Sequence, residues 1–331
     1  MTTAAIVTAM RAIVQDSYGT DDVWRVAEVD RPEIADNEVL VKVEAAGLDR
    51  GTWHMMTGQP YLGRLAFGFR KPKNTVPGLD LAGTVVAVGA SVTRFGIGDE
   101  VYGIGRGSYA EFAAAREDKL ARKPSNLTFE QAAVAPVSGL TAIQAVHDVG
   151  RVVAGQRVLI VGASGGVGSY AVQIAKAAGA DVTGVSSPAK TDLVRSLGAD
   201  HVVDYTQQEF ADGSKRYDLI LDIGGSSTLS RLRRALSPRG TLVIVGGEGG
   251  GKLGGGINRQ FRALALSMVV RQRLTMKVPK ENFADLERLT DLIEAGSVTP
   301  SSDRADPLDR AAEAMRHLAA GKARGKIAVT I

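Results

Sequence analysis

A glycine-rich run with the spacing of a phosphate-binding loop stands near the middle of the chain. It reads Gly162-Ala163-Ser164-Gly165-Gly166-Val167-Gly168, with a strand-like apolar run before it and a helix-like run after it. In this context a glycine loop is informative, because free N–H groups at the start of a helix bind anions. Gly165 would let the backbone approach a pyrophosphate, and Gly168 would allow close helix-to-strand packing. We therefore expect a dinucleotide site formed by Gly162, Ser164, Gly165, Gly166, Val167 and Gly168.

The segment about twenty residues further on bears on which dinucleotide would bind. It reads Gly184-Val185-Ser186-Ser187-Pro188-Ala189-Lys190, where an NAD site normally carries Asp or Glu for the ribose 2′-hydroxyl. Hydroxyl and ammonium groups instead suit a 2′-phosphate, because they donate hydrogen bonds and positive charge. Ser186, Ser187 and Lys190 thus favour NADPH over NADH. The alternative is that the serines only cap the next helix and Lys190 is solvated.

Composition limits the remaining chemistry. The 331 residues predict about two domains at roughly 150 residues each. No residue is a cysteine, which excludes disulfides, thiolate nucleophiles and cysteine-ligated zinc. The 40 basic and 36 acidic residues leave a formal net charge of +4, which does not favour a nucleic acid as partner. No apolar run is long enough for a membrane span and no signal-peptide pattern is present, so we expect a cytoplasmic protein.

The pattern of apolar residues changes after Pro124. Before it, short β-branched runs separated by glycine-containing turns predict a β-rich domain. After it, strands and helices alternate from residue 157 to residue 245, which predicts an α/β domain with a doubly wound parallel sheet. A short strand near 274, helices over 283–295 and 308–320, a loop with Pro300 and Pro307, and a strand over 326–331 complete the chain. We expect domains over 10–125, completed by 279–331, and over 126–278.

Several motifs resemble those of one family. They are Pro77-Gly78-Leu79-Asp80-Leu81-Ala82-Gly83-Thr84-Val85, Gly98-Asp99-Glu100-Val101-Tyr102-Gly103, Gly139-Leu140-Thr141-Ala142, the glycine loop, and Ser196-Leu197-Gly198-Ala199-Asp200-His201-Val202-Val203-Asp204-Tyr205. From Met10 to Ile331 the chain resembles the medium-chain dehydrogenase/reductase superfamily, and within it the zinc-free quinone oxidoreductase-like branch. The resemblance implies a GroES-like β-rich substrate domain, a Rossmann domain and a cleft between them.

The same resemblance speaks against a metal. Zinc-bearing members carry a cysteine in the segment that here reads Ala46-Gly47-Leu48-Asp49-Arg50, and Gly-His-Glu where this chain has Gly78-Leu79-Asp80. The four histidines, His54, His147, His201 and His317, have no metal-ligand spacing. Without a metal Lewis acid, the oxidation of an alcohol lacks its usual stabilisation of the alkoxide, whereas hydride addition to an activated acceptor needs only orientation and a hydrogen-bond donor.

Two residues of this segment are the catalytic candidates. Asp49 stands where the family often has an asparagine near the nicotinamide, and His54 where several quinone reductases have a tyrosine. A carboxylate and an imidazole would therefore face the cleft, and His54 could give a proton or a hydrogen bond to the developing enolate or quinol oxygen. The alternative for His54 is a partly exposed loop histidine beside Trp53.

The resemblance implies further cofactor contacts. Thr141 would bind near the phosphates or only cap a helix, and Tyr205 would flank the adenosine phosphate together with Lys190. Lys326 would reach the cofactor or lie on the surface before an edge strand. Gly246 and Gly247, at the carboxyl end of a strand, would permit backbone close to the nicotinamide. Asp80, Tyr61 and Arg64 are weaker pocket candidates.

These expectations lead to one function and two alternatives. The function is that of an NADPH-dependent, zinc-independent reductase that transfers hydride to a quinone or an α,β-unsaturated carbonyl. The alternatives are a carbonyl or alcohol dehydrogenase of the same superfamily, and a weakly catalytic NADPH-binding sensor or crystallin-like protein. Relatives commonly pair through the edge strand of the nucleotide domain, so the alternating run over 274–278 predicts a homodimer.

Overall fold

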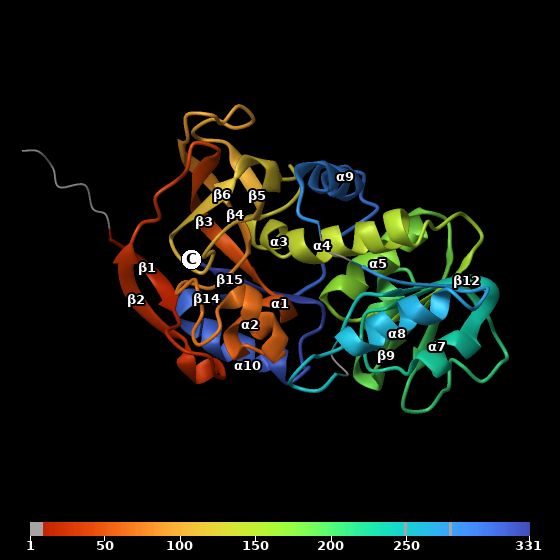
Figure 1. Ribbon diagram of the computed structural model, residues 1–331. Coiled ribbons are helices and arrows are strands. Elements are labelled where there is room, and N and C mark those ends of the chain that lie inside the picture. Colours follow the sequence, from red (N-terminus) through yellow and green to blue (C-terminus); the bar gives the residue numbers. More distant parts are fainter. Residues whose placement is uncertain (1–8, 248–249, 278–279) are drawn as a thin grey trace, which may run out of the picture.

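The computed structural model describes residues 9–247, 250–277 and 280–331, and it is built around two main sheets (Figure 1). A β-rich part holds a seven-stranded sheet in the order β14-β15-β3-β4-β5-β7, with β6 paired to β3, and a separate antiparallel hairpin of β1 and β2. Its strands are β1 (Ala9–Val14), β2 (Arg25–Asp30), β3 (Glu38–Leu48), β4 (Asp80–Val88), β5 (Glu100–Ile104), β6 (Phe112–Arg116), β7 (Leu120–Arg122), β14 (Ser302–Pro307) and β15 (Lys326–Thr330).

The second sheet is parallel and has the order β10-β9-β8-β11-β12-β13. Its strands are β8 (Arg157–Val161), β9 (Asp181–Ser186), β10 (His201–Asp204), β11 (Tyr217–Asp222), β12 (Leu236–Ile244) and β13 (Arg273–Met276). This is the doubly wound order, in which the direction of winding reverses between β8 and β11. The fold class expected from the sequence is confirmed. Ligands of such sheets bind at the carboxyl ends of the strands beside this reversal.

The chain returns to the β-rich sheet at its carboxyl end. Strand β15 runs antiparallel to β3, with Ile327 opposite Leu48, and parallel to β14. The prediction of a loop around Pro300 and Pro307 is wrong for Ser302–Pro307, because these residues form strand β14. Strand β14 is at the edge of the sheet, where a proline without an N–H group is tolerated. The division of the chain after residues 125 and 278 stays a prediction, and residue 278 lies outside the described residues.

Helices pack against both sheets, and some of them lie between the two (Figure 1). The helices are α1 (Arg50–Thr57), α2 (Arg64–Phe67), α3 (Phe129–Ala133), α4 (Pro136–Ile143), α5 (Gly166–Ala177), α6 (Thr191–Ser196), α7 (Leu229–Ala235), α8 (Ile257–Ser267), α9 (Phe283–Glu294) and α10 (Ala311–Ala319). Helix α4 packs against α5 and α9, and its chain continues as a π-helical turn over Gln144–Val149. Within the described residues, no helix combines the length and the apolar character needed to cross a bilayer.

Candidate functional site

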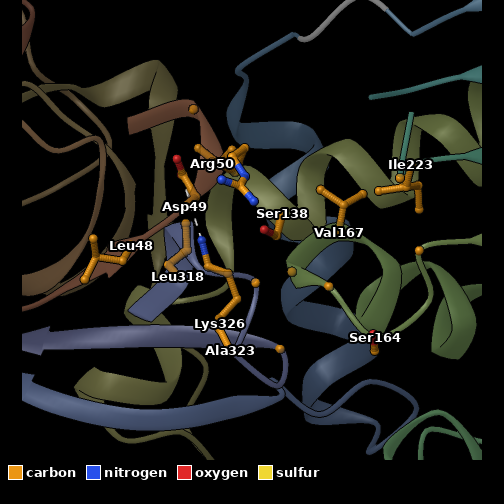
Figure 2. A pocket seen from close by; sticks show the side chains of 18 of the residues that line it. Leu48, Asp49, Arg50, Ser138, Ser164, Val167, Ile223, Leu318, Ala323 and Lys326 are labelled. Carbon is orange, nitrogen blue, oxygen red and sulfur yellow. Dashed lines mark ion pairs between the residues drawn. The ribbon is translucent and has the colours of Figure 1, made fainter. Parts of the chain in front are cut away.

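A pocket of about 450 Å³ lies between the two sheets, and we call it the cleft pocket (Figure 2). The β-rich part contributes the end of β3, the start of α1 and the segment before β15. The parallel sheet contributes the loops after β8 and β11. The lining residues are Leu48, Asp49, Arg50, Gly51, Val137, Ser138, Gly162, Ser164, Gly165, Gly166, Val167, Lys190, Ile223, Gly224, Leu318, Gly321, Ala323, Gly325 and Lys326.

The glycine loop forms one wall of this pocket and fits an anionic group. Gly162 has a φ of +90°, which favours glycine, and its N–H group donates to the carbonyl of Val185. A Cβ added to Gly165 would meet only the Gly162 carbonyl, at 3.5 Å, so the loop surface there is open. Gly165 is also the N-cap of α5, and no side chain caps this helix. The first N–H groups of α5 therefore remain available for a phosphate.

Gly168 has a different role in the same loop. A Cβ at this position would lie 2.1 Å from the Gly162 carbonyl, so the close packing of helix on strand requires glycine. Gly168 is not one of the described lining residues. Of the six loop residues expected to bind the cofactor, the other five line the pocket.

Lys326 projects into the cleft pocket from the start of β15 (Figure 2). Only 1% of the residue is exposed. Its Nζ donates a hydrogen bond to Asp80 Oδ2 at 3.0 Å and lies 3.9 Å from Asp49 Oδ2. The alternative of a surface lysine is wrong, because β15 is an interior strand of the sheet. One ammonium is thus buried between two carboxylates, and we call these three residues the ion cluster.

The two carboxylates of the ion cluster differ in their surroundings. Burial raises the pKa of Asp80 to about 7, because it outweighs the opposing charge of Lys326, and the Asp49 charge raises that pKa further. Asp49 Oδ1 accepts from Thr52 N at 2.7 Å and caps α1. Among the described residues, no hydrogen-bond donor reaches the buried Asp49 Oδ2. The pKa of the neighbouring Tyr109 is raised, mainly because the phenol is buried. The charges of Asp49 and Asp80 raise this pKa further.

A loop before β15 joins the two sides of the pocket. Lys190 Nζ donates to the carbonyls of Gly321 and Ala323 at 2.7 and 2.6 Å, and the Gly325 N–H donates to the carbonyl of Ser164. Arg324 pairs with Asp192 at 2.7 Å. Lys190 is therefore not simply solvated. Burial lowers the pKa of its ammonium, which has a third hydrogen beyond these two bonds.

Besides Gly168, six expected cofactor residues are not among the described residues that line the cleft pocket, namely Thr141, Ser186, Ser187, Tyr205, Gly246 and Gly247. Thr141 is not at a helix start, since it follows five residues of α4 and its hydroxyl donates to the Val137 carbonyl. Ser186 is buried with its hydroxyl near the Ser187 carbonyl, and Tyr205 is 55% exposed. A Cβ on Gly246 would lie 1.9 Å from the Ile223 carbonyl, so packing accounts for this glycine.

A second, smaller pocket of about 220 Å³ holds His54, and we call it the side pocket. Its lining residues are Trp53, His54, Gln59, Pro60, Gly247, Gly250, Gly251, Lys252, Gly254, Gly255, Gly256, Ile257 and Gln260. His54 Nδ1 lies 2.6 Å from the Gln59 carbonyl, which can only accept, so Nδ1 carries a hydrogen. Helix α1 lines the cleft pocket with its first residues and the side pocket with Trp53 and His54. The two pockets are therefore consecutive along this helix.

The glycine-rich segment over 250–256 is held against the β-rich part. The N–H groups of Tyr61 and Leu62 donate to the carbonyls of Lys252 and Leu253. Tyr61 and Arg64 are not among the described lining residues of either pocket. The Arg64 guanidinium stacks over the rings of Tyr18 and Tyr61, which indicates a structural role.

Sequence reasoning missed several lining residues. Arg50 is the last residue of one segment that the family resemblance singled out, and Ser138 directly precedes another, but their residue types gave no signal of their own. Ile223 and Gly224 follow β11 directly, and the rule that ligands bind at the carboxyl ends of strands could have found them. Within the described part of the chain, no group of three or more His, Cys, Asp or Glu side chains is placed to hold a metal ion.

Comparison with known proteins agrees with this architecture. Residues 35–125 match the alcohol dehydrogenase GroES-like domain, and residues 197–329 match the zinc-binding dehydrogenase family. The chain is 33% identical to the chloroplast envelope quinone oxidoreductase homolog of Arabidopsis thaliana, over 97% of this chain and 98% of that protein. It is also 33% identical to the chloroplastic NADPH-dependent alkenal/one oxidoreductase of the same plant, over 98% and 81%. The solved quinone oxidoreductase of Coxiella burnetii superposes with a TM-score of 0.86 at 27% identity, over 98% and 99%.

A GroES-like sheet and a Rossmann sheet that share a pocket at a phosphate loop define a two-domain dehydrogenase with a nicotinamide cofactor. The chain belongs to the medium-chain dehydrogenase/reductase superfamily, in its quinone oxidoreductase-like branch. The family resemblance found in the sequence is confirmed, and the protein is an oxidoreductase.

Proposed function

We propose that the protein is an NADPH-dependent, zinc-independent reductase that adds hydride to a quinone or an α,β-unsaturated carbonyl. The observation that carries this proposal is the set of groups lining the cleft pocket. It offers backbone N–H groups, two ammonium groups, a guanidinium and one carboxylate, and no thiolate or imidazole among its described residues. Such a pocket can bind a dinucleotide, but it has no soft ligand for zinc. Reduction of an already activated acceptor is the chemistry that needs no metal.

Two relatives support the substrate class, since their names specify quinone and alkenal or alkenone substrates. One of these names also specifies NADPH. In this chain the preference for NADPH rests on Lys190, which lines the cleft pocket and whose ammonium is held by two loop carbonyls. Ser186, Ser187 and Tyr205 would contribute beyond the pocket, around the same ribose.

The bound cofactor supplies the hydride. The glycine loop and the start of α5 hold its pyrophosphate, and Lys326 adds positive charge beside them. His54, whose Nδ1 lies 2.6 Å from the Gln59 carbonyl, donates a proton or a hydrogen bond to the oxygen of the acceptor from the side pocket. Asp49, proposed from the sequence as catalytic, acts here by holding α1 and Lys326 in place.

The deciding experiment follows oxidation of NADPH with 1,2-naphthoquinone and with a panel of enones and simple aldehydes. Turnover of quinones or enones, but not of aldehydes or alcohols, is expected. Preferred turnover of alcohols with NADP⁺ would indicate an alcohol dehydrogenase instead. Tight binding of NADPH with no turnover of any acceptor would favour the binding-protein alternative.

Zinc independence has a separate test. Metal content of the purified protein is measured, and activity is compared before and after dialysis against a chelator. Unchanged activity at less than stoichiometric zinc is expected, since the described lining residues of the cleft pocket include no thiolate and no imidazole. Loss of activity that returns with added zinc would refute this part of the proposal.

A homodimer and a cytoplasmic location also remain proposals. Strand β13 is at the edge of the parallel sheet, and the neighbouring Met268 and Val269 are 82% and 79% exposed. A free sheet edge beside exposed apolar side chains favours pairing with a second copy. The remaining part of the expected pairing segment, at residue 278, lies outside the described residues. Light scattering at micromolar concentration should give a dimer, and a monomer would refute the pairing.

A further inference from the structure

The ion cluster carries more negative than positive charge in a place where an anion should bind. Asp80 is fully buried, Lys326 is 1% exposed and Asp49 is 7% exposed. The Lys326 ammonium therefore compensates two carboxylates, of which Asp80 is 3.0 Å and Asp49 is 3.9 Å away. With all three groups ionised, the cluster has a net charge of −1 in a setting that water does not screen.

The groups around Asp80 come from five parts of the fold. Asp80 Oδ1 accepts from Val137 N in α4 at 2.9 Å, and Oδ2 accepts from Lys326 in β15. Asp49, between β3 and α1, adds a second negative charge. Tyr109, before β6, and Tyr170, in α5, have raised pKa values because of burial, and the charge of Asp80 contributes to both. Both tyrosines therefore stay neutral, and Lys326 is the cation in hydrogen-bond contact with Asp80.

The cluster also lies beside the phosphate loop. A Cβ added to Gly166, the first residue of α5, would be 2.9 Å from Cδ of Lys326. The neighbouring Gly325 bonds to the Ser164 carbonyl and forms a bridge with Gly165. The pyrophosphate that the loop is built to hold would therefore be placed close to Lys326, and Figure 2 shows this side chain and Ser164 around the same space.

We infer that Asp80 takes up a proton when the pyrophosphate of the cofactor binds beside Lys326. The inference rests on the proposed cofactor site but not on the proposed acceptor. The pyrophosphate brings negative charge and draws the Lys326 ammonium towards itself, which weakens the bond from Nζ to Asp80 Oδ2. The proton comes from solvent and is bound at Oδ2, so the neutral carboxyl no longer repels the pyrophosphate. Asp80 is thus a positioning residue whose protonation tunes cofactor affinity.

The direction of the pH effect follows from the free protein. Asp80 has a raised pKa of about 7, so at neutral pH about half of the molecules carry the carboxylate. Cofactor binding raises this pKa further, because it adds negative charge and removes part of the Lys326 contact. Cofactor affinity should therefore be constant below about pH 6 and fall as the pH rises above 7, by up to about tenfold per pH unit.

Calorimetry measures the proton directly. NADPH is titrated into the protein at pH 7 in buffers of different ionisation enthalpy, and ADP-ribose is used as a second probe because it has the pyrophosphate but no titrating 2′-phosphate. The wild-type protein should take up about half a proton with ADP-ribose. If ADP-ribose and NADPH fail to bind at all, the proposed cofactor site is wrong. If they bind without proton uptake, this inference alone is wrong.

Variants assign the proton to Asp80. Asp80→Asn should abolish the uptake and the fall in affinity above pH 7, whereas Asp80→Glu should restore both. Asp118→Asn removes a carboxylate of the same domain whose side chain is 47% exposed, and it should behave as the wild type. Loss of proton uptake in Asp49→Asn, together with unchanged uptake in Asp80→Asn, would assign the proton to Asp49 and overturn the inference.

Infrared difference spectra of the wild type provide a second test if Asp80→Asn does not fold. A protonated-carboxyl band must appear on cofactor binding, and its absence would overturn the inference.

Discussion

Arg259 Nη1 lies 2.5 Å from Oδ2 of the fully buried Asp222 and thereby fixes helix α8 to the carboxyl end of strand β11. The same guanidinium donates to the carbonyls of Ser227 and Gly246. Burial raises the pKa of Asp222 even though Arg259 opposes this. Arg259 thus connects Gly246, before the glycines of the side pocket, with helix α8, which follows them.

The first prediction concerns this pair. Arg259→Met should lower the free energy of unfolding by about 3–5 kcal/mol, because it leaves a buried carboxylate without its partner. Asp222→Asn should lower it less, since the guanidinium keeps two carbonyl acceptors. Urea unfolding measures both variants at the same pH. Equal effects of the two variants would show that the buried charge is not what the arginine compensates.

The second prediction separates two glycines of the phosphate loop. Gly168→Ala should lower the melting temperature, because its Cβ would lie 2.1 Å from the Gly162 carbonyl. Gly165→Ala should leave the melting temperature nearly unchanged, since its Cβ has room, and it should weaken cofactor binding by occupying the open surface of the loop. Thermal unfolding and fluorescence titration with NADPH are the measurements. Full cofactor affinity in folded Gly165→Ala would contradict the proposed position of the pyrophosphate.

The third prediction concerns Lys190, which has two roles to distinguish. Lys190→Ala should weaken NADPH binding on the order of tenfold or more and NADH binding much less, because only NADPH carries the 2′-phosphate. Arg324→Ala is the matched control, since it loosens the same loop through its contact with Asp192. Equal losses for both cofactors in Lys190→Ala would mean that the lysine serves only to hold the loop.

The fourth prediction is catalytic. His54→Phe should lower turnover of the best acceptor about a hundredfold and leave the dissociation constant of NADPH unchanged, because the imidazole lies in the side pocket. His54→Gln, which retains a hydrogen-bond donor, should recover part of the rate. His201→Phe is the control, as this histidine is exposed in strand β10. Undiminished turnover in His54→Phe would remove His54 from the mechanism.

The fifth prediction links Asp80 to the pH dependence of folding. Its pKa is about 7 in the folded protein and 3.8 in the reference state, so the folded state binds the extra proton between these values. The stability that protonated Asp80 contributes is therefore present below about pH 4 and lost as the pH rises to about 7. Over this range the unfolding free energy of the wild type should therefore decrease relative to that of Asp80→Asn, by roughly 4 kcal/mol at most. A difference that does not change with pH would contradict the raised pKa.

The sequence predicted what depends on local pattern. The glycine loop, its strand and its helix were placed correctly because their signals lie within thirty consecutive residues. Strand β14 was missed, since Pro300 and Pro307 mark turns in most contexts, and only the free edge of the sheet permits Pro307 to end a strand. Helices α1 and α8 were missed because glycine and polar residues at their starts obscure the helical pattern.

The site was less predictable than the fold. The sequence around Lys326 was compatible with both a cofactor residue and a surface residue. The lysine is buried because strand β15 lies between β14 and β3. Its partner Asp80 is 246 positions away in the sequence. No local pattern reports such a pair, nor that Thr141 bonds within its own helix. Contacts of this kind become visible only when the sheets are assembled.

The position of strand β15 has a consequence for how the protein matures in the cell. The Rossmann strands are synthesised before β15, so a nascent chain can form the phosphate loop while Lys326 and the loop at 321–325 are still missing from the pocket. A ligand stabilises a fold only to the extent that the fold can bind it. Nicotinamide cofactor should therefore protect the finished protein from proteolysis far more than it protects the growing chain on the ribosome.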